Sequence, residues 1–299
     1  MPLLFTHAVA APQTLSSYAI LTVTQAQLPE TNIDSLSGQC QHMKMLTVIP
    51  IPAFKDNYIW LVLDNQHRAI LVDPGDATPV LQVLQDKKID LQAIWITHHH
   101  HDHCGGVSEI LNHFPVPVYG PCFDGAIAGL TNPIQQGDKI AGLGESFEIL
   151  DIPGHTKGHI AFVGAGRVFC GDTLFTAGCG RLFEGTAAQL YDSLQKLAAL
   201  PEDTLIYCGH EYTLNNLRFA QIVEPDNAAI QRRLEQVIKL RQQNLPTVPA
   251  NLAIEKQTNP FLRCDISNVQ KAVQAYLKTK SEHPIEYFAI LRLWKDNFT

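Results

Sequence analysis

The hydrophobic positions of the chain follow two periods, and one gives way to the other near residue 211. Before that point, short apolar runs alternate with turn residues, which predicts buried strands with helices between some of them. After it, apolar residues recur at helical spacing and predict helices over 216–222, 227–240, 267–277 and 285–294. The pattern therefore favours an α/β region followed by a smaller helical region.

The first region has enough strands for two sheets. Predicted strands cover 46–51, 58–63, 69–72, 91–96, 146–152, 160–163, 168–170 and 204–208, with a further short strand near Val116. Predicted helices cover 78–85 and 107–113, and another helix is built on Leu190, Leu194 and Leu197. Because helices follow some strands and hairpins join others, we expect two sheets flanked by helices.

Residues 1–44 differ from the rest of the chain. They contain no Lys or Arg before Lys44 and carry Glu30 and Asp34, so they lack the basic character of a secretory or transit segment. We expect an extension that is disordered or results from a misassigned start, with Met45 as the natural first residue. The predicted domains are therefore this extension, a catalytic domain over 45–210 and a helical substrate-binding domain over 211–299.

Composition narrows the class of protein. The 299 residues are 45% hydrophobic and 17% charged, which is typical of a globular enzyme, and no run approaches the roughly 18 apolar residues of a membrane helix. A net charge of −7 disfavours nucleic acid as a partner and leaves a small molecule. Seven Cys without the spacing of a disulfide framework indicate free thiols, so we expect a cytoplasmic protein. A monomer is a separate expectation.

Histidines are concentrated at one place. Five of the 13 fall between His98 and His103, directly after the strand predicted over 91–96. Imidazole and carboxylate groups that leave a rigid strand in one loop are typical of a metal site for zinc, iron or manganese. A surface cluster or a tag is the alternative, but neither explains an Asp-His step directly after a buried strand.

Three later loops resemble this one in chemistry. His155, Asp172 and His210 each follow a predicted strand and lie beside a glycine, where the backbone can approach a shared centre. One such dipeptide is weak evidence, but four loops of this kind in one chain together predict a constructed metal centre.

The spacing His98-x-His100-x-Asp102-His103 resembles the HxHxDH signature of the metallo-β-lactamase superfamily. The resemblance implies an α/β fold, a four-layer αβ/βα sandwich, with two divalent metal ions at one edge. It assigns the first ion to His98, His100 and His155, and the second to Asp102, His103 and His210. Asp172 would bridge the two ions, whereas His99, His101, His159 and Asp73 would be supporting residues.

Longer segments resemble one family within that superfamily, the hydroxyacylglutathione hydrolases or glyoxalase II enzymes. They are PGHTKGH at 153–159, GDTLF at 171–175, GCGRLFEG at 178–185, GHEYTLNNL at 209–217, NPFLR at 259–263 and RLWKDNF at 292–298. The last three lie in the helical region and are the most selective. The resemblance implies glutathione contacts from Arg181, Phe183, Tyr212, Arg292 and Lys295, although Phe183 stands where Tyr is frequent.

The implied reaction is the second step of methylglyoxal detoxification, in which S-D-lactoylglutathione and water give glutathione and D-lactate. A hydroxide between the two metal ions, zinc in first place and iron or manganese as substitutes, would attack the thioester carbonyl. Asp102 and Asp172 would fix the ions and the attacking oxygen.

Other functions remain open at this stage. A glutathione persulfide dioxygenase with one iron shares the superfamily, but it would not need the complete second ligand set. A β-lactamase or lactonase would not need the helical tail. A metal-binding module without turnover needs only the histidines, but ligands spread from His98 to His210 favour a constructed site.

Overall fold

The computed structural model describes residues 46–278 and 283–298. These residues belong to one compact unit, Met43–Thr299. The expectations for residues 1–44 lie outside the described part, and the predicted division of the unit at residue 210 stays a prediction. Within the described residues, no helix is long and apolar enough to cross a membrane.

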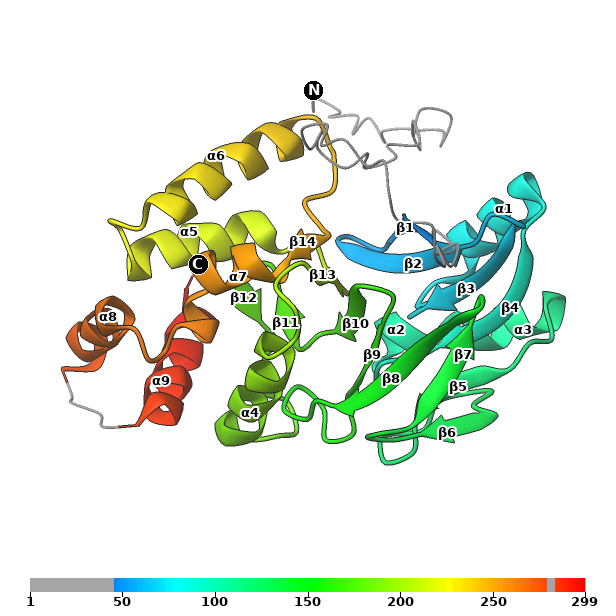
Figure 1. The fold of residues 1–299 in the computed structure, drawn as a ribbon, viewed down its shortest axis with the longest axis horizontal. Coiled ribbons are helices and arrows are strands. Elements are labelled where there is room, and N and C mark those ends of the chain that lie inside the picture. The colour runs from blue at the N-terminus through cyan, green and yellow to red at the C-terminus, as the bar shows by residue number, and fades with distance from the viewer. Residues whose placement is uncertain (1–45, 279–282, 299) are drawn as a thin grey trace, which may run out of the picture. The chain divides into compact units, whose positions relative to one another are not determined.

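The first sheet has six strands in sequence order (Figure 1). They are β1 (Thr47–Ala53), β2 (Asn57–Leu63), β3 (Arg68–Val72), β4 (Asp90–Trp95), β5 (Val118–Pro121) and β6 (Asn132–Ile134). The first two pairs are antiparallel, and β3 to β6 run parallel. Helices α1 (Ala77–Lys87) and α3 (Val107–His113) connect parallel neighbours, as such crossovers require.

Alternating side chains of this sheet enter two separate cores. In β2, Trp60 and Val62 belong to the core shared with the second sheet, whereas Ile59 and Leu61 pack in the core with α1 and α3. A strand buried on both faces needs a nearly continuous apolar run, and this explains the sequence NYIWLVL.

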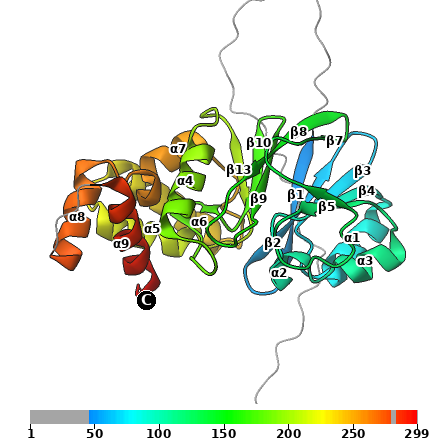
Figure 2. The ribbon, with the colours of Figure 1, turned by 90° about the horizontal axis from the view of Figure 1, so that it is seen from below.

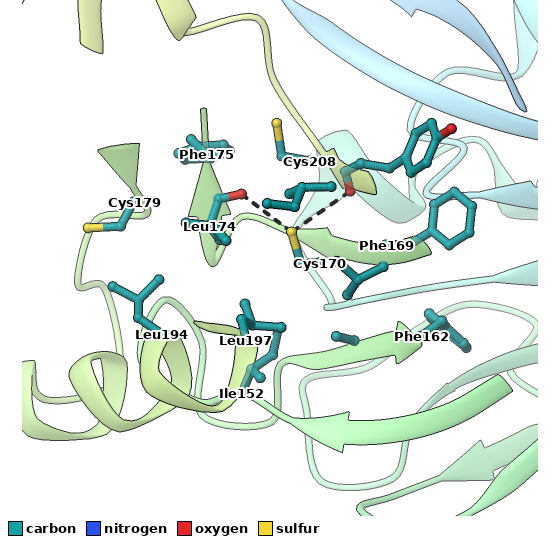
Figure 3. Close-up of a cluster of buried hydrophobic side chains, with 14 of the residues drawn as sticks. Ile152, Phe162, Phe169, Cys170, Leu174, Phe175, Cys179, Leu194, Leu197 and Cys208 are labelled. Carbon is teal, nitrogen blue, oxygen red and sulfur yellow. Dashed lines mark hydrogen bonds between the residues drawn. The ribbon is translucent and has the colours of Figure 1, made fainter. Parts of the chain in front are cut away.

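The second sheet has the order β14-β13-β10-β9-β8-β7. Its strands are β7 (Lys139–Gly142), β8 (Glu145–Asp151), β9 (Ile160–Gly164), β10 (Arg167–Gly171), β13 (Leu205–Cys208) and β14 (Ala250–Asn251). A small hairpin of β11 (Leu174–Phe175) and β12 (Gly178–Cys179) follows β10. Helix α4 (Ala187–Ala198) begins with a capping box at Thr186 and buries Leu194 and Leu197 beside this sheet (Figure 3).

The remaining elements are mainly helical (Figures 1 and 2). They are α5 (Thr213–Val223), α6 (Ala228–Gln242), α7 (Leu252–Thr258), the 3₁₀ turn η1 (Pro260–Leu262), α8 (Ser267–Leu277) and α9 (Pro284–Asp296). Helix α5 packs against α6, and α9 packs against α4 and α8. The C-terminal helices thus rest on the helical layer of the second sheet.

The arrangement of α1 and α3, the first sheet, the second sheet and α4 confirms the predicted four-layer sandwich with a helical C-terminal part. Every predicted strand and helix after residue 45 has a counterpart. The sequence did not indicate β6, β7, β11, β12, β14, α2 (His101–Cys104) or α7, because elements of two to seven residues are too short for periodicity to reveal.

Candidate metal centre

The predicted ligands all follow the carboxyl ends of strands. His98 and His100 follow β4, while Asp102 and His103 lie in α2, the short helix that begins at His101. His155 follows β8, Asp172 follows β10 and His210 follows β13. Backbone hydrogen bonds join the two sheets at this edge, from Ile160 N to Thr97 O (3.0 Å) and from Tyr58 N to Gly209 O (2.8 Å). The strand ends of both sheets therefore meet at one site, as ligand sites of α/β folds do.

His98, His100 and His155 form the first ligand set. His100 Nδ1 lies 3.1 Å from His98 Nε2 and 3.0 Å from His155 Nε2. Burial, followed by the charge of His103, lowers the pKa of His98 well below its usual value, and burial also lowers the pKa values of His100 and His155. Three neutral imidazoles therefore present nitrogen lone pairs to one point, which suits a cation.

Asp102, His103 and His210 form the second ligand set. Asp102 Oδ2 lies 3.6 Å from His103 Nε2 and 3.4 Å from His210 Nε2. Burial would lower the pKa of His210, but Asp172 and Asp102 outweigh it and raise the value to about 10. This set also offers an anionic ligand, the Asp102 carboxylate, which the first set lacks.

Asp172 lies between the two sets. Its Oδ2 is 3.4 Å from His155 Nε2 and 3.3 Å from His210 Nε2, and its Oδ1 is 3.3 Å from His103 Nε2. Burial would raise the pKa of Asp172, but His103 and His210 hold it well below its usual value. A buried, ionised carboxylate therefore faces both sets.

These residues fit a bound cation. Among the residues that the structure describes, His103 Nε2 and Asp172 Oδ1 are buried in the centre without a hydrogen-bond partner, an arrangement that costs free energy unless another group satisfies them. Both sets have ligand atoms within 4.8 Å of one another. Asp73 with His98 and His103 meets the same criterion, but both oxygens of Asp73 already accept hydrogen bonds from Thr97.

Gly209 shows how tightly the backbone approaches the centre. A Cβ at this position would lie 2.5 Å from His103 Cε1 and 2.6 Å from Asp172 Oδ1, closer than real Cβ atoms come. The glycine beside His210 is therefore required by packing, as the sequence pattern predicted.

The remaining histidines of the motif support the centre or face away from it. His101 is exposed, and His99 lies 3.0 Å from Asp124 and 3.4 Å from Glu184. His159 Nε2 accepts a hydrogen bond from the backbone N of Asp172 (3.1 Å). Asp73 Oδ2 lies 3.0 Å from His103 Nδ1, on the side of the ring that faces away from the other ligands.

Two aromatic side chains lie beside the ligands. Tyr212 stacks on His210 with ring centroids 4.7 Å apart and planes 3° apart. Phe183 meets His155 edge-on at 5.1 Å and is 64% exposed, so its ring is open to a ligand.

The three basic residues predicted to contact glutathione lie together, but they differ in exposure and in hydrogen-bond partners. Arg181 is largely exposed and its Nε lies 3.4 Å from Asp296 Oδ1. Arg292 is only 4% exposed, and it donates to Cys179 O (2.8 Å) and to the same oxygen of Asp296 (3.0 Å). Lys295 donates to Asn215 Oδ1, and burial with the charges of Arg292 and Arg181 lowers its pKa to about 8. We call Arg181, Arg292, Lys295 and Asp296 the basic cluster.

The sequence did not point to three polar residues that contact this centre. Asp56 Oδ1 lies 2.9 Å from His210 Nδ1, Asn57 donates to Asp102 Oδ2 (2.9 Å), and Asp124 accepts from His99 N (2.7 Å). Asp56 ends the turn between β1 and β2 and Asn57 begins β2, where polar residues usually mark only a turn, so their position gave no signal.

The comparisons with known proteins agree with this architecture. Residues 54–121 and 124–210 match the family model of the metallo-beta-lactamase superfamily, and residues 211–298 match that of the hydroxyacylglutathione hydrolase C-terminus. The hydroxyacylglutathione hydrolase of Photobacterium profundum is 53% identical over 85% of this chain and 100% of its own length. That of Aeromonas hydrophila subsp. hydrophila is 54% identical over the same shares.

Among solved structures, TTHA1623 in a di-iron-bound form is 26% identical with a TM-score of 0.52, over 72% of this chain and 100% of that chain. The identity with the two bacterial relatives extends over their whole length, and the family models cover both the sandwich and the C-terminal helices. These findings confirm the resemblance inferred from the motifs. The chain belongs to the hydroxyacylglutathione hydrolase family, within the metallo-β-lactamase superfamily.

Proposed function

We propose that this chain hydrolyses S-D-lactoylglutathione, a 2-hydroxyacyl thioester of glutathione, to glutathione and D-lactate. The observation that carries the proposal is the juxtaposition of a two-part ligand cluster around Asp172 with the basic cluster, which begins nine residues later at Arg181. The hydroxyacylglutathione hydrolases that this chain resembles at 53–54% identity support the same reaction.

The centre would hold two divalent cations. His98, His100 and His155 would hold the first ion, Asp102, His103 and His210 the second, and Asp172 would contact both. Zinc is our first assignment, and iron or manganese suit the same ligands. Bound there, the ions would supply an activated water and a Lewis acid for the thioester carbonyl.

Asp102 and Asp172 would act directly in the reaction. Both carboxylates are ionised, because neighbouring histidines, and Asn57 in the case of Asp102, lower their pKa values despite partial or full burial. They face the same space and are acceptors only, so they can orient an attacking water by its protons. We assign this role to both residues.

The residues beside the centre would position the substrate. Tyr212 and Phe183 flank the ligands from opposite sets and offer apolar surface to the acyl group and its thioester. Arg181, Arg292 and Lys295 supply the positive charge for the carboxylates of glutathione, and Arg181 is the most accessible of them. In this proposal, residues 45–210 carry the chemistry and residues 211–299 complete the glutathione site.

The other candidate functions are not favoured. A one-iron persulfide dioxygenase would leave the second ligand set without a purpose, although that set is complete and converges on Asp172. A binding module without turnover would not need a basic cluster beside the metal centre. We also propose a cytoplasmic location, because the six cysteines among the described residues are free. A monomer stays part of the proposal.

The first test follows the loss of thioester absorbance of S-D-lactoylglutathione with purified protein, before and after chelation. We expect chelator-sensitive turnover, and a raised KM in an Arg181→Ala/Lys295→Ala variant. Asp90→Asn, an exposed substitution at the far end of β4, is the control and should match the unmodified protein. Absence of turnover in protein shown to contain metal would overturn the proposal.

A further inference from the structure

The two ligand sets differ in the groups that lie behind their histidines. In the first set, His98 Nδ1 lies 3.0 Å from the Thr97 hydroxyl, and His155 Nδ1 lies 2.8 Å from the backbone oxygen of Arg181. Both of these partners are neutral. In the second set, carboxylates stand in the same place: Asp73 Oδ2 is 3.0 Å from His103 Nδ1, and Asp56 Oδ1 is 2.9 Å from His210 Nδ1.

The turn between β1 and β2 supplies one of these carboxylates, and the first residue of β2 supplies one further contact. Asn57, next to Asp56, donates its side-chain amide to Asp102 Oδ2 (2.9 Å). Two adjacent residues, where the turn meets β2, therefore each hold one member of the second set. Among the described residues, neither forms a hydrogen bond with the first set.

Backbone hydrogen bonds fix this turn against the residues that directly follow β13. Glu211 N donates to Asp56 O, and Tyr58 N donates to Gly209 O, both at 2.8 Å. Asn57 also forms a bridge with His210 itself. The side chains of Asp56 and Asn57 are thus held in register with His210, although His210 follows Asp56 by 154 positions in the chain.

We infer that Asp56 and Asn57 are positioning residues that make the second cation site selectively dependent on the junction between the β1–β2 turn and β2. A carboxylate that accepts the Nδ1 proton fixes the tautomer of His210 and directs the Nε2 lone pair at the centre. It also makes the ring a better donor to a cation. Asn57 prevents the Asp102 carboxylate from turning away. The inference rests on the proposed two-ion centre, not on which thioester is cleaved.

The experiment measures ion binding without turnover. Metal-free protein is titrated with Zn²⁺ in competition with a chromophoric chelator, for the unmodified chain, Asp56→Asn and the control Asp90→Asn. We expect two ions to bind the unmodified chain and the control with equal affinities. In Asp56→Asn one of the two ions should lose about 10- to 100-fold in affinity, as loss of such partners typically causes, while the other ion is unaffected.

Asn57→Ser provides a second, independent variant, since it removes the amide that holds Asp102 without changing charge. The same selective loss of one ion would support the inference. Equal affinities in both variants and the unmodified chain, or an equal loss of both ions, would overturn it, as would binding of one ion only to the unmodified chain. Two-ion binding with the expected selective loss but no S-D-lactoylglutathione hydrolysis would refute the proposed function and leave this inference standing.

Discussion

In the metal centre, the rings of His98, His103, His155 and His210 each have their outer nitrogen within 3.0 Å of an oxygen from another residue. In the basic cluster, Arg181 and Arg292 share one oxygen of Asp296, and Arg181 is largely exposed. In the first region these contacts orient the rings before anything binds, whereas in the second Arg181 is accessible to an incoming carboxylate that can replace Asp296. Rigid placement suits ions that need fixed geometry, and an exchangeable ion pair suits a substrate that must leave after each turnover.

The largest expected effect comes from the residue that joins the two ligand sets. Asp172→Asn keeps the shape but removes the charge that faces His155, His103 and His210, so metal affinity and activity should both fall by more than about 100-fold. Metal content after dialysis and thioester turnover measure this. Asp192→Asn, exposed on α4, is the matched control. Full metal content with full activity in Asp172→Asn would show that the carboxylate is dispensable.

Two arginine substitutions test whether Arg292 stabilises the fold while Arg181 binds the substrate. Arg292→Met should lower the melting temperature, because it leaves Cys179 O without its buried donor, a cost of roughly 1–3 kcal/mol. Arg181→Met should leave the melting temperature unchanged and raise KM about tenfold, the equivalent of one charge-assisted hydrogen bond. If Arg292→Met were as stable as the unmodified chain and only KM changed, Arg292 would be a ligand contact instead of an anchor.

The buried carboxylate of Glu255 contacts the β11–β12 hairpin, which lies in the chain between Asp172 of the metal centre and Arg181 of the basic cluster. Glu255 Oε2 accepts from Ala177 N (2.8 Å), and burial raises the pKa of Glu255 from 4.5 to about 7. The folded state therefore binds more protons than the unfolded state between these values, and the contribution of Glu255 to stability falls as pH rises from about 4.5 to 7.

Glu255→Gln should remove this contribution, since an amide does not titrate. Melting temperatures at pH 5, 6 and 7 should then fall less steeply with pH than those of the unmodified chain. Glu235→Gln on α6, where Glu235 is exposed, is the control. Parallel profiles for all three proteins would contradict the predicted role of burial.

The clustering of these His and Asp side chains could be predicted from the sequence because most of them lie close together in the chain or directly after strands. His98 to His103 are contiguous, and His155, Asp172 and His210 each follow a strand that its apolar run predicts. The predicted strands and the positions of these side chains therefore indicate the same site. The supporting residues could not be predicted in this way. Asp56 reaches His210 only through the packing of one sheet edge against the other, and a single acidic residue in a turn carries no sign of that contact.

The basic cluster could be predicted from the sequence only in part. Helical spacing places Arg292 and Lys295 on one face of α9, and the motif implied that both contact glutathione. Periodicity does not reveal what a helix face packs against, and the structure buries Arg292 against Cys179 and Phe261. The assignment of Arg292 as a glutathione contact therefore stays a prediction that the Arg292→Met variant examines.

The smallest expected effect concerns Lys295, whose pKa of about 8 places its titration near the assay range. Its ammonium group is charged below this value and loses its charge above it, so the affinity for an anionic substrate should weaken as pH rises from 7 to 9. We expect KM to rise on the order of threefold, as one partly exposed ion pair is lost. Lys295→Arg should flatten this profile, because a guanidinium stays charged throughout. Lys239→Arg on α6 should retain the rise. A KM that rises equally in Lys295→Arg would place the titrating group elsewhere. A KM that is constant in the unmodified chain would show that the charge of Lys295 does not contribute to substrate binding, because binding would then take up no proton.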